Sequence, residues 1–207
     1  MGVGVSALVE RAIAAAGLED IAVARRIGAL SPSQVERLRQ ADLLALGALA
    51  DVVRSEEVGA DVKIFADGAP AGSPDERLVV LPSEGSVALT GLELLREVAV
   101  ARVVAPPAAR VRVDWGRCGL ELAQVALGFG ASELVGPIAN KRGLPLAEGE
   151  MLGVGKKSGW EPAELVKRRE LAACVERGGR VAVFVARDGT PEALPPSPHQ
   201  ETAECRP

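Results

Sequence analysis

The chain has 207 residues, a formal net charge of −4 and a sequence pI near 5.3, with acidic and basic side chains interspersed. This balance provides no basic surface for nucleic acid or for an anionic membrane, so we expect neither partner. No apolar run approaches the roughly 20 residues that cross a bilayer, and the start has no basic leader, which favours the cytoplasm.

Hydrophobic residues make up 48% of the chain but aromatic residues only 2%, so small aliphatic side chains must fill the core. The length suits one domain. We expect a single α/β domain over residues 1–187, with a helical lead-in at 1–60 and a sheet with its helices at 61–187. Residues 188–207 are rich in proline and polar side chains and are expected to be a disordered tail.

Apolar side chains at helical spacing predict helices at 5–16, 21–28 and 41–54. Another helix is expected to begin at Ser31, the N-cap, with Pro32 at its first position and Gln34 completing a capping box.

Downstream, short β-type segments alternate with helical ones. Strands are expected at 61–66, 77–81, 110–114 and 180–186, and helices at 90–104, 119–129 and 161–177. Thr90 is the expected N-cap of the first of these helices. The loop at 67–75 and the glycine-rich segment 141–159 show no periodicity, and the latter is expected to be irregular. The alternation predicts an α/β fold with a small, mainly parallel sheet of four to five strands.

Cysteine and histidine are scarce. Cys118, Cys174 and Cys205 are odd in number and far apart, which is typical of reduced thiols. The one histidine, His199, lies in the expected tail, so the usual general base and most zinc-site designs are missing. We therefore expect no metal, no cofactor and no catalytic residue, although enzymatic activity is left open.

Two stretches carry more than a general α/β pattern. The first is Ala-Asp-Leu-Leu-Ala-Leu-Gly-Ala-Leu-Ala-Asp-Val-Val-Arg at 41–54, followed by Gly59 and Val62. The second comprises Thr-Gly-Leu-Glu-Leu-Leu-Arg at 90–96, Ala-Val-Ala-Arg at 99–102, Val-Arg-Val-Asp-Trp at 111–115, Gly119, 122–124, 126–127, 129–131, Leu134 and Gly136. Residues 179–188 form a weaker third match, with Ala182 where a proline is expected.

These stretches resemble, in order, the radical S-adenosylmethionine enzymes of the futalosine route to menaquinone and the related deazaflavin-core synthase subunit. The resemblance implies a (βα)8 barrel and a four-iron cluster bound by a CxxxCxxC loop. Here residues 65–89 stand in place of that loop and most of the barrel, and they contain no cysteine. Because closely spaced thiolates are needed to hold such a cluster, we expect no radical chemistry. Pro137, where the family has threonine, is another departure.

Four or five strands cannot close an eight-stranded barrel, so the expected sheet is partial-barrel-like but open. Its edges must be protected in another way. We expect either that the N-terminal helices cover them or that a second subunit pairs with them.

Polar residues near strand ends are the candidates for binding. Asp114 and Trp115 stand at the carboxyl end of a strand, where α/β folds place ligands, although Asp114 is equally suited to cap the next helix. Glu121 and Gln124 lie three residues apart on one helix face, where they could present polar groups to a ligand side by side. The alternative interpretation is that this face is only exposed to solvent. The segment 153–159 resembles a phosphate loop, but position 150 is Glu where the motif has Gly, which favours a solvated loop. The candidate ligand-binding residues are Arg112, Asp114, Trp115, Glu121, Gln124 and Lys156. Lys167, Arg168 and Arg169 are interpreted as surface charges.

Two hypotheses follow. By the resemblance, the chain is a non-catalytic accessory or partner protein near menaquinone biosynthesis, acting on a protein partner or as a homo-oligomer. Alternatively, it is a binding protein or enzyme for an anionic or nucleotide-like small molecule, using the strand-end pocket near Asp114 and the 153–159 loop.

Overall fold

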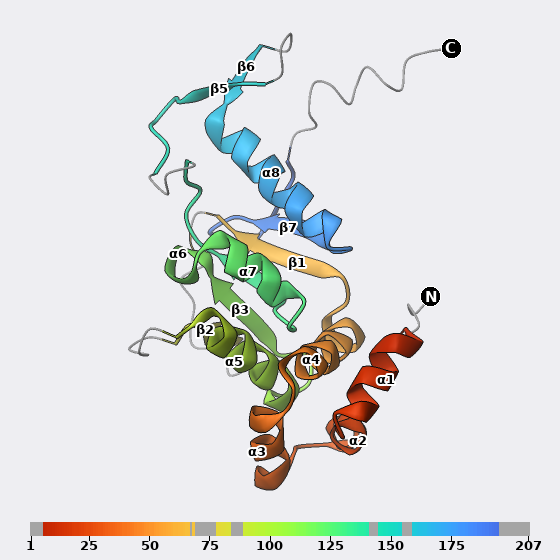
Figure 1. Ribbon diagram of the computed structural model, residues 1–207. Helices are drawn as coiled ribbons and strands as arrows, with labels where there is room; N and C mark the ends of the chain where they lie inside the picture. Colours follow the sequence, from red (N-terminus) through yellow and green to blue (C-terminus); the bar gives the residue numbers. More distant parts are fainter. Residues whose placement is uncertain are drawn as a thin grey trace, which may run out of the picture.

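The computed structural model describes residues 6–66, 68, 78–83, 89–140, 145–154 and 159–194 (Figure 1). Its main sheet has six strands in the order β2-β3-β4-β1-β7-β8. Their bounds are Asp61–Phe65 for β1, Leu78–Leu81 for β2, Arg110–Asp114 for β3, Glu133–Val135 for β4, Val181–Val185 for β7 and Pro191–Glu192 for β8. All neighbours are parallel except β7 and β8. The predicted α/β class and open, mainly parallel sheet are confirmed.

The long helices pack together on one face of this sheet. They are α4 (Leu43–Val58), α5 (Gly91–Val104), α7 (Leu120–Leu127) and α8 (Ala163–Arg177), and α6 (Trp115–Cys118) is a single turn between β3 and α7. Alternate strand residues, such as Ile64, Val111 and Phe184, belong to the same buried cluster as side chains from all four long helices. The core therefore lies between the sheet and one helical layer, and α5 and α7 stand in front of the strands in Figure 1.

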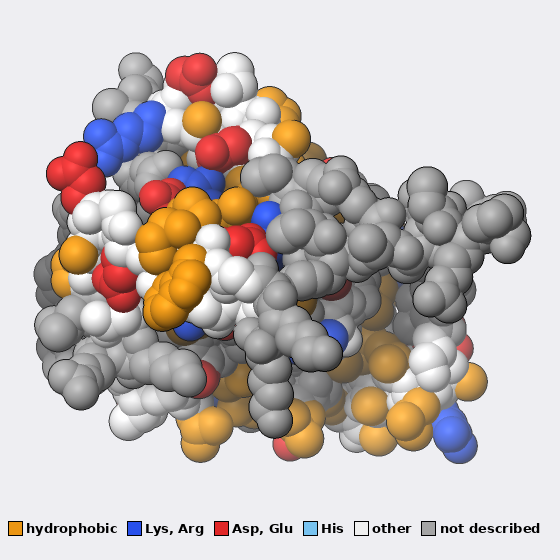
Figure 2. All heavy atoms as spheres, turned by 90° about the horizontal axis from the view of Figure 1, so that it is seen from above, with side chains coloured by type: hydrophobic (Ala, Val, Ile, Leu, Met, Phe, Trp, Pro, Cys, Tyr) orange, Lys and Arg blue, Asp and Glu red, His pale blue; other side chains and the backbone are white. Residues whose placement is uncertain are grey.

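The outer surface carries both charges. Figure 2 views the molecule from the top of Figure 1, and on this face acidic and basic side chains are mixed with hydrophobic ones. Among the helices of the described ranges, none combines the length and apolar character that crossing a membrane requires.

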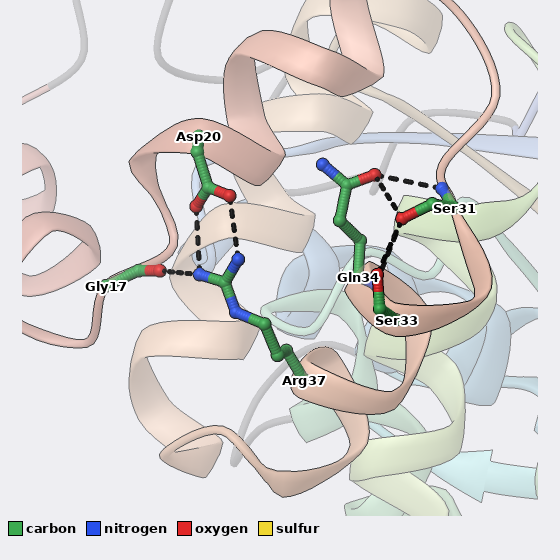
Figure 3. Close-up of polar contacts among 6 residues, drawn as sticks. All are labelled: Gly17, Asp20, Ser31, Ser33, Gln34 and Arg37. Atoms are coloured by element: carbon green, nitrogen blue, oxygen red, sulfur yellow. Dashed lines mark hydrogen bonds and ion pairs between the residues drawn. The ribbon is translucent and has the colours of Figure 1, made fainter.

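Three short helices precede the sheet: α1 (Ala7–Ala15), α2 (Glu19–Ile27) and α3 (Pro32–Gln40). The predicted start of α3 is confirmed, because Ser31 N donates to Gln34 Oε1 at 2.9 Å and Gln34 N donates to Ser31 Oγ at 3.3 Å (Figure 3). Arg37 then joins α3 to α2 by donating to both oxygens of Asp20 and to Gly17 O (Figure 3). These contacts fix where α2 begins.

The other face of the sheet carries a buried charge pair. Arg112 and Glu133 are register partners on β3 and β4, and only 6% and 1% of their surfaces are exposed. Arg112 Nη2 lies 2.6 Å from Glu133 Oε2, and its guanidinium stands 4.3 Å from the centre of the Phe65 ring. Because Phe65 alternates with the core residue Ile64, this cluster lies opposite the helices.

Several segments differ from the sequence predictions. The segment 141–159, expected to be irregular, contains strand β5 (Met151–Gly153), which pairs antiparallel with β6 (Trp160–Pro162). The expected tail is also wrong at its start, because the chain after Asp188 turns and pairs β8 with β7. Strand β4 and helix α6 were not predicted. The 67–75 loop (except Gly68), Lys156 and residues 195–207 lie outside the described residues.

The expected edge protection by the N-terminal helices is not what the described residues show. Helix α1 packs against α4, and α3 packs against α5. The edges of the main sheet are β2 and the two-residue β8, so the lead-in thickens the helical layer instead.

Candidate functional site

A cleft of about 620 Å³ lies between α6–α7 and α8. Trp115 enters it directly after β3, and Pro137 two residues after β4, so the cleft stands at the carboxyl ends of these strands. Open parallel sheets bind ligands at this end. The lining residues are Trp115, Gly116, Gly119, Leu120, Glu121, Gln124, Pro137, Ile138, Ala139, Asn140, Lys167, Glu170, Leu171 and Cys174.

Trp115 forms a fixed wall of this cleft. Only 7% of the residue is exposed, and its indole Nε1 donates to Pro137 O at 3.0 Å. A Cβ atom at Gly136 would lie 2.5 Å from the indole ring. Glycine at this position therefore lets the ring pack on the chain leaving β4, which preorganises the wall.

Polar side chains face each other across the cleft. Glu121 and Gln124 come from α7, and neither has a hydrogen-bond partner within the part of the chain that the structure describes. On α8, Lys167 Nζ forms an ion pair of 2.6 Å with Glu170. With Glu121, the cleft therefore has two carboxylates against one ammonium group, so its charge does not favour an anion.

A thiol also lines the α8 side. Arg177 Nη2 donates to Cys174 Sγ at 2.8 Å. Cys118 is the other free thiol among the described residues, and burial, followed by the nearby Asp114 carboxylate, raises the pKa of its thiol. A raised pKa keeps Cys118 protonated and unreactive at neutral pH. Cys205 lies outside the described residues.

The structure separates the predicted site residues. Trp115, Glu121 and Gln124 line the cleft together. Asp114 instead caps α6, accepting a hydrogen bond of 2.8 Å from Gly116 N. Arg112 is paired with Glu133 on the opposite face of the sheet, and Lys156 is outside the described residues.

The α8 side of the cleft was missed by sequence reasoning. The sequence pattern indicates a surface charge at Lys167 and no function for Leu171 or Cys174, yet all three residues line the cleft. Arg168 is not a surface charge either, because only 6% of it is exposed, and it pairs with Glu164 and Glu192. The helical periodicity of α8 does not indicate which helix lies beside it. Its position next to α7 follows from the order of the strands.

No group of three metal-ligating side chains occurs in the described ranges, and His199 lies beyond them. Comparison with known proteins adds no family. Neither the family models nor the curated proteins contain a match to this chain, so its resemblance to the futalosine-pathway enzymes rests on the residues quoted above alone.

Proposed function

We propose that the chain binds a small neutral or cationic organic molecule in the cleft between α7 and α8. The observation that carries this proposal is a cleft of about 620 Å³ in which Glu121 and Gln124 have no hydrogen-bond partner in the described chain. Ligand sites are typically clefts of about 300–1,000 Å³ with apolar walls and a few placed polar groups.

The walls suit a flat apolar body with polar edges. Trp115, Leu120 and Leu171 offer apolar surface, while the Glu121 carboxylate accepts hydrogen bonds and the Gln124 amide both donates and accepts. The sequence hypothesis expected an anionic ligand. Because the cleft contains more carboxylates than ammonium groups, we propose a neutral or cationic ligand instead. Of the 153–159 loop, the structure describes residues 153, 154 and 159, and these three do not line the cleft.

Thermal unfolding with three probes tests this. Adenosine is neutral, benzamidine is cationic and adenosine 5′-monophosphate is anionic. We expect one of the first two to stabilise the chain, by about 2.7 kcal/mol at 100 times its dissociation constant, and the monophosphate to do less. The variant Glu121→Gln should weaken benzamidine binding, whereas Glu97→Gln, an exposed residue of α5, should not. No stabilisation by either probe, or equal effects of the two variants, would contradict the proposal.

A second candidate is that the chain is a non-catalytic, radical-enzyme-like partner protein connected with menaquinone biosynthesis. One feature supports it besides the resemblance. Strands β2, β3 and β4 lie side by side in chain order, and β4 then pairs in parallel with β1. A (βα)8 barrel likewise has neighbouring parallel strands in chain order.

This candidate is tested by recovering the tagged chain from its native cells and identifying co-purified proteins. A radical enzyme or another menaquinone-pathway protein is the expected partner. Recovery of the chain alone would contradict the partnership, and stoichiometric iron and sulfide in the purified protein would contradict the non-catalytic role.

A further inference from the structure

Glu121 carries the uncompensated charge of the cleft between α7 and α8. The other carboxylate of the lining, Glu170, is held in an ion pair of 2.6 Å by Lys167 Nζ. Glu121 has neither an ion pair nor a hydrogen bond within the part of the chain that the structure describes. Both of its carboxylate oxygens are therefore open to donors on a ligand.

Gln124 lies one helical turn after Glu121 on the same face of α7. Residues three apart on a helix have Cβ atoms about 5–6 Å apart, so the ends of these two side chains can meet one edge of a single flat ligand. Gln124 is half-buried and, like Glu121, has no hydrogen-bond partner among the described residues. Its amide nitrogen can donate where the carboxylate accepts twice. Together the two side chains offer acceptor, acceptor and donor in a row.

The apolar walls of the cleft suit a flat ring system. Trp115 and Leu171 are only 7% and 4% exposed, so the surrounding packing holds both in place. The indole of Trp115 is fixed further by its hydrogen bond of 3.0 Å to Pro137 O. The cleft volume of about 620 Å³ lies within the usual range of about 300–1,000 Å³ for small-molecule sites, which leaves space for a two-ring molecule.

The order of donors and acceptors discriminates between heterocyclic rings. A 2-amino-4-oxo ring, as in guanine and pterins, presents amine, ring N–H and carbonyl side by side, which is donor, donor and acceptor. Its two donors can bind one carboxylate through a pair of charge-assisted hydrogen bonds. Adenine instead directs the lone pair of a ring nitrogen at the carboxylate, and hypoxanthine lacks the amine, so each leaves a carboxylate oxygen without a donor.

We propose that the cleft selects a 2-amino-4-oxo ring, of the guanine nucleoside or pterin class. This inference rests on the proposed binding of a neutral or cationic molecule in the same cleft. Glu121 accepts from the amine and the ring N–H, Gln124 donates to the carbonyl, and the ring lies against Trp115 and Leu171. The unphosphorylated forms are the expected ligands, because the ammonium group of Lys167 is already paired.

Calorimetry on the full chain tests this selectivity with guanosine, neopterin and inosine, which differs from guanosine by the missing 2-amino group. We expect guanosine or neopterin to bind at least about fivefold more tightly than inosine, because inosine leaves one oxygen of Glu121 without a donor. The tighter of guanosine and neopterin identifies the class as nucleoside or pterin.

Two variants separate recognition of the ring edge from a general effect on the cleft. Gln124→Glu places a carboxylate against the ring carbonyl, so it should weaken the tighter ligand about fivefold and yet strengthen benzamidine, whose amidinium group only donates. Glu121→Gln should make the affinities for that ligand and for inosine nearly equal. Glu97→Gln, at an exposed position of α5, is the control and should change neither.

Three results would overturn this inference and leave the proposed function in place. They are equal affinity for inosine and the tighter ligand, parallel effects of Gln124→Glu on that ligand and on benzamidine, and binding of adenosine or benzamidine without binding of guanosine or neopterin. If none of these five molecules binds at about 1 mM, both the inference and the proposed function are wrong.

Discussion

Arginine side chains take an unusual part in the interior of this protein. Five of them are buried among the described residues: Arg25, Arg54, Arg102, Arg112 and Arg168. In a chain with few aromatic residues, their long aliphatic stems fill space that large apolar side chains usually occupy. The stem of Arg102, for example, runs along Gly130, where an added Cβ would lie 2.8 Å from its Cγ.

The pair of Arg112 with Glu133 gives the first prediction. Glu133→Gln leaves a buried guanidinium without its counter-charge, which costs about 3–5 kcal/mol of unfolding free energy. Urea denaturation measures this loss. The exposed pair of Arg26 with Glu56 is the control, and Glu56→Gln should cost less than about 1 kcal/mol. Similar losses in both variants would show that Glu133 is not effectively buried.

Gly136 gives the second prediction. In Gly136→Ala the new Cβ would meet the Trp115 ring at 2.5 Å, so either the ring or the chain after β4 must move. Overpacking of this kind costs about 1–3 kcal/mol, and the indole fluorescence should change because the wall of the cleft shifts. Gly153→Ala is the control, since no atom lies within 4 Å of its added Cβ. An unchanged stability and spectrum in Gly136→Ala would contradict the assigned role.

At the scale of elements, the sequence predicted helices better than short strands. Helices α3 and α5 carry complete local signals, because Ser31 with Gln34 and Thr90 with Glu93 form capping boxes. Strand β4 has only three residues and is defined by pairing with β1 and β3, which are distant in sequence. Strands β5 and β6 are equally short, so no alternation marks them.

The capping box of α5 gives the third prediction. Backbone and side-chain hydrogen bonds from Thr90 hold the pKa of Glu93 below its ordinary value of 4.5. A lowered folded-state pKa means that this contribution to stability is present above pH 4.5 and is lost as the pH falls through the folded-state pKa. NMR titration should show the low pKa in the native chain and a return toward 4.5 in Thr90→Ala.

The same variant should lose about 1 kcal/mol of unfolding free energy at neutral pH, the usual cost of removing a helix cap. Thr90→Ser keeps the hydroxyl and is the control. If the Glu93 titration were the same in Thr90→Ala and in the native chain, the capping box would not be the cause of the shift.

For the whole molecule, strand order decides where the cleft forms. Strand β1 lies between β4 and β7, so the chain from β4 to β7 must cross β1, and α8 is the helix of that crossing. This places α8 beside α7 and creates the cleft between them. The sequence indicated the alternation of strands and helices but not which strands are neighbours, and so only the α7 half of the site could be predicted.

Strand order also gives the fourth prediction. Strand β1 is paired on both sides, whereas β2 is an edge strand paired only with β3. Amide exchange measured by mass spectrometry should therefore be slower in 61–65 than in 78–81, because central strands open only with the global transition. Equal exchange in the two strands would contradict the central position of β1.

The position of β1 also affects synthesis on the ribosome. Its second neighbour, β7, ends at Val185, which is 120 residues after the end of β1 at Phe65. At 5–20 residues per second, translation of that interval takes about 6–24 s. During this time one side of β1 has no partner strand within the nascent chain. The central strand is therefore made early, but its pairing is completed late.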